Sequence, residues 1–274
     1  MRLLPAMAAC GCTLAAGPVF ADAQDDQYVV SSAIDQGQID LAIRLLKDNA
    51  DRGDPDALTT IGLLYEYGRG VPQSYEDAAD WYHKAAKQGY VIAQYNLGVL
   101  YHSGRGVPRD YGAAAEWFGR AARQGDSAAQ FNLGVMYESG RGVPQDYEEA
   151  AQWYGKAAEQ GQSRAQGNLA AMYRDGRGFA QDYEKAVALY TQAAEQGNSK
   201  AQYSLGLLYA EGKGVAQNLV QAYLWLELAA TQGENDAHAA IDELSAKVSR
   251  AESRAAKTEA RALRTSMPLK NSGN

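Results

Sequence analysis

The chain has 274 residues, of which 46% are hydrophobic, and its formal net charge at pH 7 is −7. This acidic balance argues against nonspecific nucleic-acid binding, so no nucleic-acid partner is expected. The hydrophobic fraction is ordinary for a protein with a buried core, but 18 tyrosines beside 4 phenylalanines indicate that one local pattern is reused.

The N-terminal segment has the features of a secretory signal peptide, predicted over residues 1–21 with a second cleavage position after Ala23. Arg2 gives it a basic start, no charge follows as far as Ala16, and Ala21 ends a small-residue cleavage motif. The uncharged run is too short for a membrane span. We therefore expect a periplasmic or secreted protein of a bacterial envelope.

Both cysteines, Cys10 and Cys12, lie inside this segment. A lipid-bearing cysteine is the alternative to a cleaved signal, but the usual leucine three residues earlier is absent. The processed chain would therefore contain no disulfide and no thiol that acts as a nucleophile or metal ligand.

Residues 26–53 are predicted to form N-terminal capping helices. Ile39 and Ala42 stand 36 residues before Tyr75 and Ala78, so this segment matches the second half of a repeating unit.

Five copies of one 36-residue pattern fill residues 54–233. The shared pattern is Ala-x-x-x-Leu-Gly-x-x-Tyr, then Gly-basic-Gly, then Tyr-x-x-Ala, and finally Ala-Ala-x-Gln-Gly, with single departures in some copies. In the second copy, Ala93 and Leu97 begin one apolar stripe with helical spacing, and Tyr111 and Phe118 belong to another. Each copy is therefore predicted to form two helices that bury their apolar faces only by stacking on neighbouring copies.

The ends of the predicted helices carry regular signals. A residue whose side-chain oxygen can accept from first-turn amides precedes each second helix, and a glycine such as Gly89 follows it. The predicted cap residues are Ser74, Asp110, Asp146, Asp182 and Asn218.

These motifs resemble the Sel-1-like repeat family, whose members are related to tetratricopeptide repeats. The resemblance covers residues 54–233, and its departures in the fourth and fifth units, such as Gly167 and Ala170, affect packing detail only. It implies an all-α fold, a right-handed α-solenoid of antiparallel helix pairs that serves as a scaffold for protein–protein interaction. The partner is expected to be a protein or peptide, which the sequence does not identify.

No catalytic residue, metal site or cofactor is expected. His83, His102 and His238 belong to different units, and neither His-Glu-x-x-His nor Ser-x-x-Lys occurs. The cysteine-rich family members linked to β-lactam chemistry differ from this chain, which lacks their cysteines. The prediction is a scaffold that is not an enzyme, and the alternative is an enzyme on a repeat scaffold that acts on cell-wall or β-lactam chemistry.

The candidate partner-binding residues lie on the first helix of each pair, which lines the concave face in tetratricopeptide-like stacks. By resemblance, the repeated asparagines occupy a position where related repeats bind a peptide backbone or a terminal carboxylate. The alternative is that each asparagine ties one repeat to its neighbour, the role that we favour for the repeated glutamines Gln94, Gln130, Gln166 and Gln202. The predicted site consists of Tyr95, Asn96, Phe131, Asn132, Asn168 and Tyr203.

The Gly-basic-Gly step differs in context from a phosphate loop because it follows a helix and not a strand. Two glycines there suit positive φ angles in a tight turn. The basic residues between them can act as helix C-terminal cations or form a basic ridge that contacts a partner. They are Arg69, Arg105, Arg141, Arg177 and Lys213.

Residues 234–265 are predicted to form a C-terminal capping helix with a basic stripe, and residues 266–274 a disordered tail. The stripe is interpreted as a solvated helix face or, alternatively, as a weak contact for an anionic surface. The protein is expected to be a monomer. The stripe residues are Lys247, Arg250, Arg254, Lys257, Arg261 and Arg264.

Overall fold

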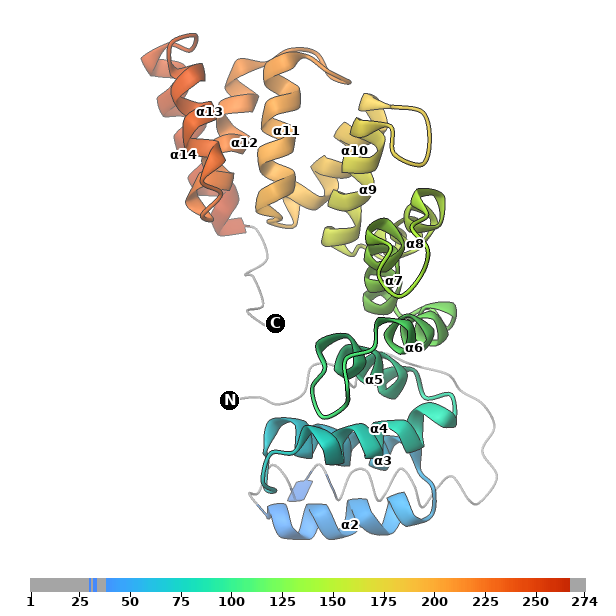
Figure 1. Cartoon of the computed structure of the whole chain (residues 1–274). Coiled ribbons are helices and arrows are strands. Elements are labelled where there is room, and N and C mark those ends of the chain that lie inside the picture. Colours follow the sequence, from blue (N-terminus) through green and yellow to red (C-terminus); the bar gives the residue numbers. More distant parts are fainter. Residues whose placement is uncertain (1–29, 31, 34–37, 267–274) are drawn as a thin grey trace, which may run out of the picture. The chain divides into compact units, whose positions relative to one another are not determined.

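The computed structural model describes residues 30, 32–33 and 38–266, and every regular element in this part of the chain is an α-helix (Figure 1). The predicted signal peptide and residues 267–274 lie outside the described residues. The chain divides into two compact units, with the boundary between Gln88 and Gly89. None of the described helices combines the length and the apolar character that a membrane span requires.

The first unit contains α2 (Ile39–Asp51), α3 (Pro55–Tyr67) and α4 (Tyr75–Lys87), and α3 packs against both of the others. The helix α2 lies in the segment predicted to cap the repeats, of which residues 26–29, 31 and 34–37 lie outside the described part of the chain. It ends at Asp51, and α3 begins four residues later behind the N-cap Asp54, which accepts from the amide of Asp56.

The second unit contains four complete helix pairs and two further helices. Each helix from α5 to α12 packs against the next one along the chain, and α12 also packs against α13 and α14 (Figure 1). This is the predicted α-solenoid of antiparallel helix pairs. The helices are α5 (Val91–Ser103), α6 (Tyr111–Arg123), α7 (Ser127–Ser139), α8 (Tyr147–Glu159), α9 (Ser163–Asp175), α10 (Tyr183–Glu195), α11 (Ser199–Glu211), α12 (Leu219–Thr231), α13 (Asp236–Ser245) and α14 (Arg250–Ser266).

Side-chain caps fix the start of nearly every repeat helix. All five predicted cap residues of the second helices accept a hydrogen bond from a first-turn amide, as Asp146 does from the amides of Glu148 and Glu149. The first helices are capped as well, by Asp54, Asp126, Gln162 and Asn198, which the sequence analysis did not single out. These bonds satisfy amides that have no partner within the helix.

Within a pair, a glycine on the first helix allows an aromatic ring of the second to lie directly on its backbone. A Cβ atom on Gly98 would stand 2.8 Å from Cδ1 of Phe118, and one on Gly134 would stand 2.7 Å from Cδ1 of Tyr154. Ordinary contacts are longer than 3.4 Å, so no larger residue fits without displacing the ring. The repeated Leu-Gly step therefore sets the spacing of the two helices.

The Gly-basic-Gly step joins neighbouring repeats through the backbone. Gly140 ends α7 in the left-handed conformation, and Gly142 has a φ of +75°. A Cβ atom on Gly142 would lie 2.1 Å from the carbonyl oxygen of Tyr111, the first residue of α6 in the preceding repeat. The step is therefore a turn that packs on the neighbouring helix.

The C-terminal segment forms two helices, where the sequence analysis expected one. The amide of Glu252 donates to Oγ of Ser249, and the amide of Ser249 donates to Oε2 of Glu252, at 3.2 and 2.9 Å. This reciprocal capping box starts a new helix at Arg250. The predicted basic stripe is therefore interrupted, and Lys247 lies in the turn before α14.

Candidate functional site

The predicted partner-binding residues lie on one side of α5, α7, α9 and α11, at equivalent positions of consecutive repeats. Five of them remain partly exposed. We call this surface the first-helix face and define it by Tyr95, Asn96, Asn132, Asn168 and Tyr203.

Phe131, the sixth predicted residue, belongs to the core and offers almost no contact area. Its exposed fraction is 5%, and the guanidinium carbon of Arg164, from the next first helix, lies 4.5 Å from the centre of its ring. The ring also packs 5.8 Å from that of Tyr154. The prediction that Phe131 contacts a partner is corrected, because a side chain of the following repeat covers it.

Asn168 lies close to a side chain of the preceding repeat. The hydroxyl of Tyr154 donates to Oε2 of Glu138 at 2.7 Å, and the side chain of Asn168 lies near the same hydroxyl. Burial and the bonded Glu138 raise the pKa of Tyr154. This proximity favours the structural alternative for Asn168, in which the asparagine contacts the neighbouring repeat.

Asn132, one repeat earlier, has no such partner. The position of Tyr154 is occupied there by Phe118, whose ring carries no hydroxyl. Within the described part of the chain, the amide group of Asn132 makes no hydrogen bond that meets ordinary geometry. It is half-buried, so its donor and acceptor remain free for a ligand on this face.

The buried glutamines have the structural role that was expected. Nε2 of Gln130 donates to the carbonyl of Ala122 in the preceding repeat, while its Oε1 accepts from Nε2 of Gln160 at 2.8 Å. Gln166 and Gln202 repeat the arrangement. Because both ends of each amide are satisfied, these side chains are unavailable to a partner.

The five predicted ridge residues have different surroundings. Arg177 donates to Oε1 of Glu138 at 2.6 Å, and Nζ of Lys213 lies 2.7 Å from Oε2 of Glu211. Arg69 lies over the ring of Tyr67, at 5.3 Å, and Nε of Arg105 donates to Oγ of Ser103 at 3.2 Å. Arg141 is exposed, and no carboxylate among the described residues pairs with it. Arg177 and Lys213 are therefore engaged by carboxylates of this chain, whereas the charge of Arg141 is available to a partner.

His102 lies close to Arg141 and Arg109. Its ring centre is 5.3 Å from that of Tyr111, and Cζ of Arg109 is 5.9 Å from the same ring. Burial, followed by the charges of Arg141 and Arg109, lowers the pKa of His102. The other two histidines lie on α4 and α13, and the described residues contain no group of three or more side chains suited to hold a metal ion.

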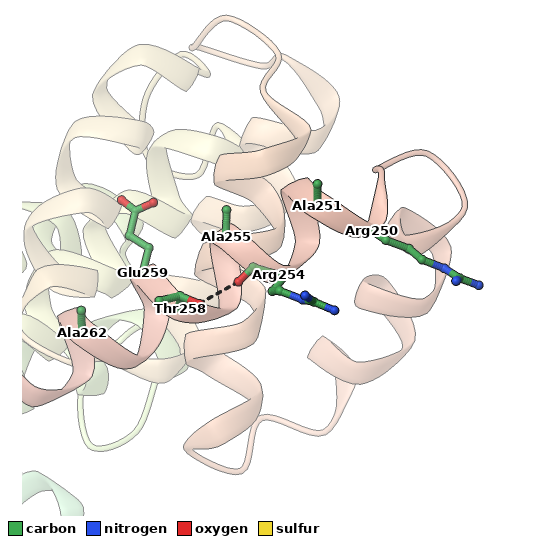
Figure 2. A pocket seen from close by; sticks show the side chains of 7 residues that line it. All are labelled: Arg250, Ala251, Arg254, Ala255, Thr258, Glu259 and Ala262. Atoms are coloured by element: carbon green, nitrogen blue, oxygen red, sulfur yellow. Dashed lines mark hydrogen bonds between the residues drawn. The ribbon is translucent and has the colours of Figure 1, made fainter.

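The helix α14 presents two different faces. Ala256 and Ala260 are buried, in the same core cluster as residues of α12. Arg250 and Arg254 are exposed, and Figure 2 shows both side chains extending from α14. The residues that line the pocket over α14 are Arg250, Ala251, Arg254, Ala255, Thr258, Glu259 and Ala262.

Comparisons with known proteins agree with this geometry. The family model "Sel1 repeat" matches residues 55–90, 91–126, 127–162, 163–198 and 199–234. A Sel1 repeat protein of Oxalobacter formigenes has a similar structure, with a TM-score of 0.73 and 29% identity, over 91% of this chain and 99% of that one.

A second similar structure is a protein described as a protective antigen of uropathogenic Escherichia coli with an SLR fold. Its TM-score is 0.73 at 35% identity over 80% of this chain, which spans about half (48%) of that protein's length. No curated protein matches the chain. The five matched units, together with the capped helix pairs, show that the chain belongs to the Sel1 repeat family.

Proposed function

We propose that this protein is an exported scaffold that binds a protein segment along the first-helix face, the concave side of the predicted solenoid. Sel1 repeats are typical scaffolds for protein–protein interaction, and the described helices build such a scaffold. The observation that carries the proposal is the free amide of Asn132, on a face whose neighbouring polar groups are mostly satisfied internally.

The residues of the face suit an extended segment. An asparagine amide offers one donor group and one acceptor, which can pair with the N–H and C=O of a peptide backbone. Tyr95 and Tyr203 add aromatic contact area, of the kind enriched at interface hot spots. Both side chains are partly exposed. The face therefore combines backbone recognition with side-chain contacts, as peptide-binding grooves do.

The binding experiment compares asparagines that differ in their internal bonds. Asn132→Ala removes a group without an internal partner, so capture of partner proteins from an envelope extract should fall severalfold while stability is unchanged. Gln152→Ala, an exposed change on α8, is the matched control. Equal capture by the wild type and Asn132→Ala would contradict the proposed site.

Export is proposed from the signal-like segment at residues 1–21. The Escherichia coli relative, described as a protective antigen, is in keeping with a location outside the cytoplasm. Mass spectrometry of the protein from the native host should give an N-terminus at Asp22 or Gln24. A chain that still carries Met1 would contradict export.

A weak contact with an anionic surface through α14 is a second proposal. The arginines of this helix are exposed while Ala256 and Ala260 are buried, so they can approach a charged surface without disturbing the core. Enzyme activity remains the contrary hypothesis for the chain as a whole. Clear turnover of nitrocefin or peptidoglycan by the purified protein would replace the scaffold proposal.

A further inference from the structure

One corner of the second repeat departs from its neighbours in a correlated way. In the first repeat the hydroxyl of Tyr82 donates to Oε2 of Glu66 at 2.6 Å, and in the third Tyr154 donates to Glu138 at 2.7 Å. In the second repeat these two positions are Phe118 and His102. Both the carboxylate and the hydroxyl that would hold it are therefore missing there.

A cation is added at the same corner. In the other four repeats, a glutamine before the second helix donates from Nε2 to a backbone carbonyl seven residues earlier, at 2.6 to 2.8 Å. The second repeat has Arg109 at this position. Its guanidinium lies over Tyr111, whose ring also contacts His102. The substitution replaces a neutral structural bond by a positive charge.

Arg141 brings a third basic group to this corner. The close contact of Gly142 with the backbone of Tyr111 fixes the loop that carries Arg141 beside α6. The equivalent loop residue of the next repeat, Arg177, is bound to the carboxylate of Glu138 at 2.6 Å. For Arg141 the corresponding residue is His102, so its carboxylate partner is absent. The lowered pKa of His102 agrees with this crowding of basic groups.

We propose that this corner binds a carboxylate of the partner, an aspartate or glutamate side chain in the bound protein segment. That carboxylate supplies the negative charge which Glu138 provides in the next repeat, and it lies among Arg141, His102 and Arg109. The inference deepens the proposed function and rests on it, because it names the chemistry of the segment that the first-helix face binds.

The repeat symmetry connects the corner to Asn132. In the next repeat, Glu138 accepts from the hydroxyl of Tyr154 and Asn168 lies near that hydroxyl, so the asparagine position and the carboxylate position are adjacent. Asn132 therefore lies at the same place relative to the corner. A segment that bonds the amide of Asn132 through its backbone can reach the three basic groups with a neighbouring side chain. Arginine–carboxylate bonds are among the stronger hydrogen bonds in proteins.

The opposite end of the second unit has the reverse charge. After burial, the charges of Asp236, Glu234 and Glu243 raise the pKa of Tyr203, and none of these three carboxylates is buried. An acidic side chain is repelled there and attracted at the corner around Arg141. The charge distribution along the face therefore favours one direction of the bound segment.

The test uses a variant that gives the second repeat the residues of its neighbours. His102→Glu combined with Arg109→Gln restores the glutamate and the glutamine that other repeats hold, so the fold is preserved. Lys87→Glu, an exposed change on α4, lowers the net charge by the same amount, two units, and is the control. Fluorescence anisotropy measures binding of labelled octaglutamate and octaglutamine peptides, at low and at physiological salt.

We expect octaglutamate to bind the wild type and Lys87→Glu with the same affinity, which falls at higher salt. The affinity of the double variant should be lower by about tenfold or more. Octaglutamate that binds all three proteins equally, or none, overturns the inference. Inorganic phosphate that displaces octaglutamate at an equal concentration of anionic groups also overturns it, since the site would then be one for small anions.

Capture of the partner from an envelope extract separates this inference from the proposed function. If Asn132→Ala loses the partner while the double variant retains it, the face is correct and the acidic segment is wrong. If both variants lose the partner, the proposed face and the acidic segment are both supported. Retention by both variants contradicts the proposed face, whatever the peptides show.

Discussion

The contact between Gly142 and Tyr111 gives a quantitative test of how the repeats are joined. Gly142→Ala places a methyl group where the carbonyl oxygen of Tyr111 is 2.1 Å away, in a residue whose φ is +75°. Gly161→Ala is the matched control, because its φ is +82° and no atom lies within 4 Å of the new methyl group. The two variants share the backbone strain and differ only in the clash.

The expected magnitudes follow from these two terms. A left-handed conformation costs about 1 to 2 kcal/mol in a residue other than glycine. Forcing extra atoms into a packed site costs roughly 1 to 3 kcal/mol more. Gly161→Ala should therefore lower the free energy of unfolding by about 1 to 2 kcal/mol, and Gly142→Ala by about 2 to 5 kcal/mol.

Urea denaturation followed by circular dichroism compares the midpoints of the two variants. Amide hydrogen exchange should also show faster exchange at the start of α6 in Gly142→Ala only, because the loop no longer packs there. If Gly142→Ala is no less stable than Gly161→Ala, the Gly-basic-Gly step does not join the repeats.

Three further predictions concern single features. Tyr154→Phe removes the hydroxyl bound to Glu138 and should lower the free energy of unfolding by about 1 kcal/mol in urea; an unchanged value would contradict the bond. By NMR titration, the pKa of His102 should lie below its ordinary value and rise in Arg141→Gln. A bound carboxylate favours the imidazolium form of His102, so octaglutamate should bind more tightly as pH falls through that pKa. His102 faces Arg109, Arg141 and Tyr111. An affinity for octaglutamate that is independent of pH would show that His102 does not take part in binding. Anionic vesicles should pellet more of the wild type than of a variant in which four arginines of α14 are changed to glutamine. Equal pelleting would refute the surface contact. The changed residues are Arg250, Arg254, Arg261 and Arg264.

The repeat pattern was sufficient to predict the fold because its signals are local. Cap residues, stripe spacing and terminal glycines each act within one helix, so the helix pairs and their five second-helix caps were identified from residue types alone. The break before α14 was missed, although Ser249 and Glu252 carry a local capping signal. Their basic neighbours suggested a continuous stripe.

The candidate site was less predictable because its contacts join different repeats. Arg164 covers Phe131, and Asn168 lies near the hydroxyl of Tyr154, across boundaries that a pattern within one unit does not describe. The departures at His102 and Arg109 were visible in the sequence, but only the bonds of Glu138 in the next repeat show what they remove. Comparison between repeats would have found them.

Site-specific photo-crosslinking tests the central claim most directly, since it maps the bound partner without altering the asparagines. A photoreactive phenylalanine analogue replaces Tyr95 or Tyr203 on the first-helix face, or Gln152 on α8 as the comparison. The account predicts crosslinks to one partner from both first-helix positions and none from α8. Crosslinks that form from α8 alone would contradict it.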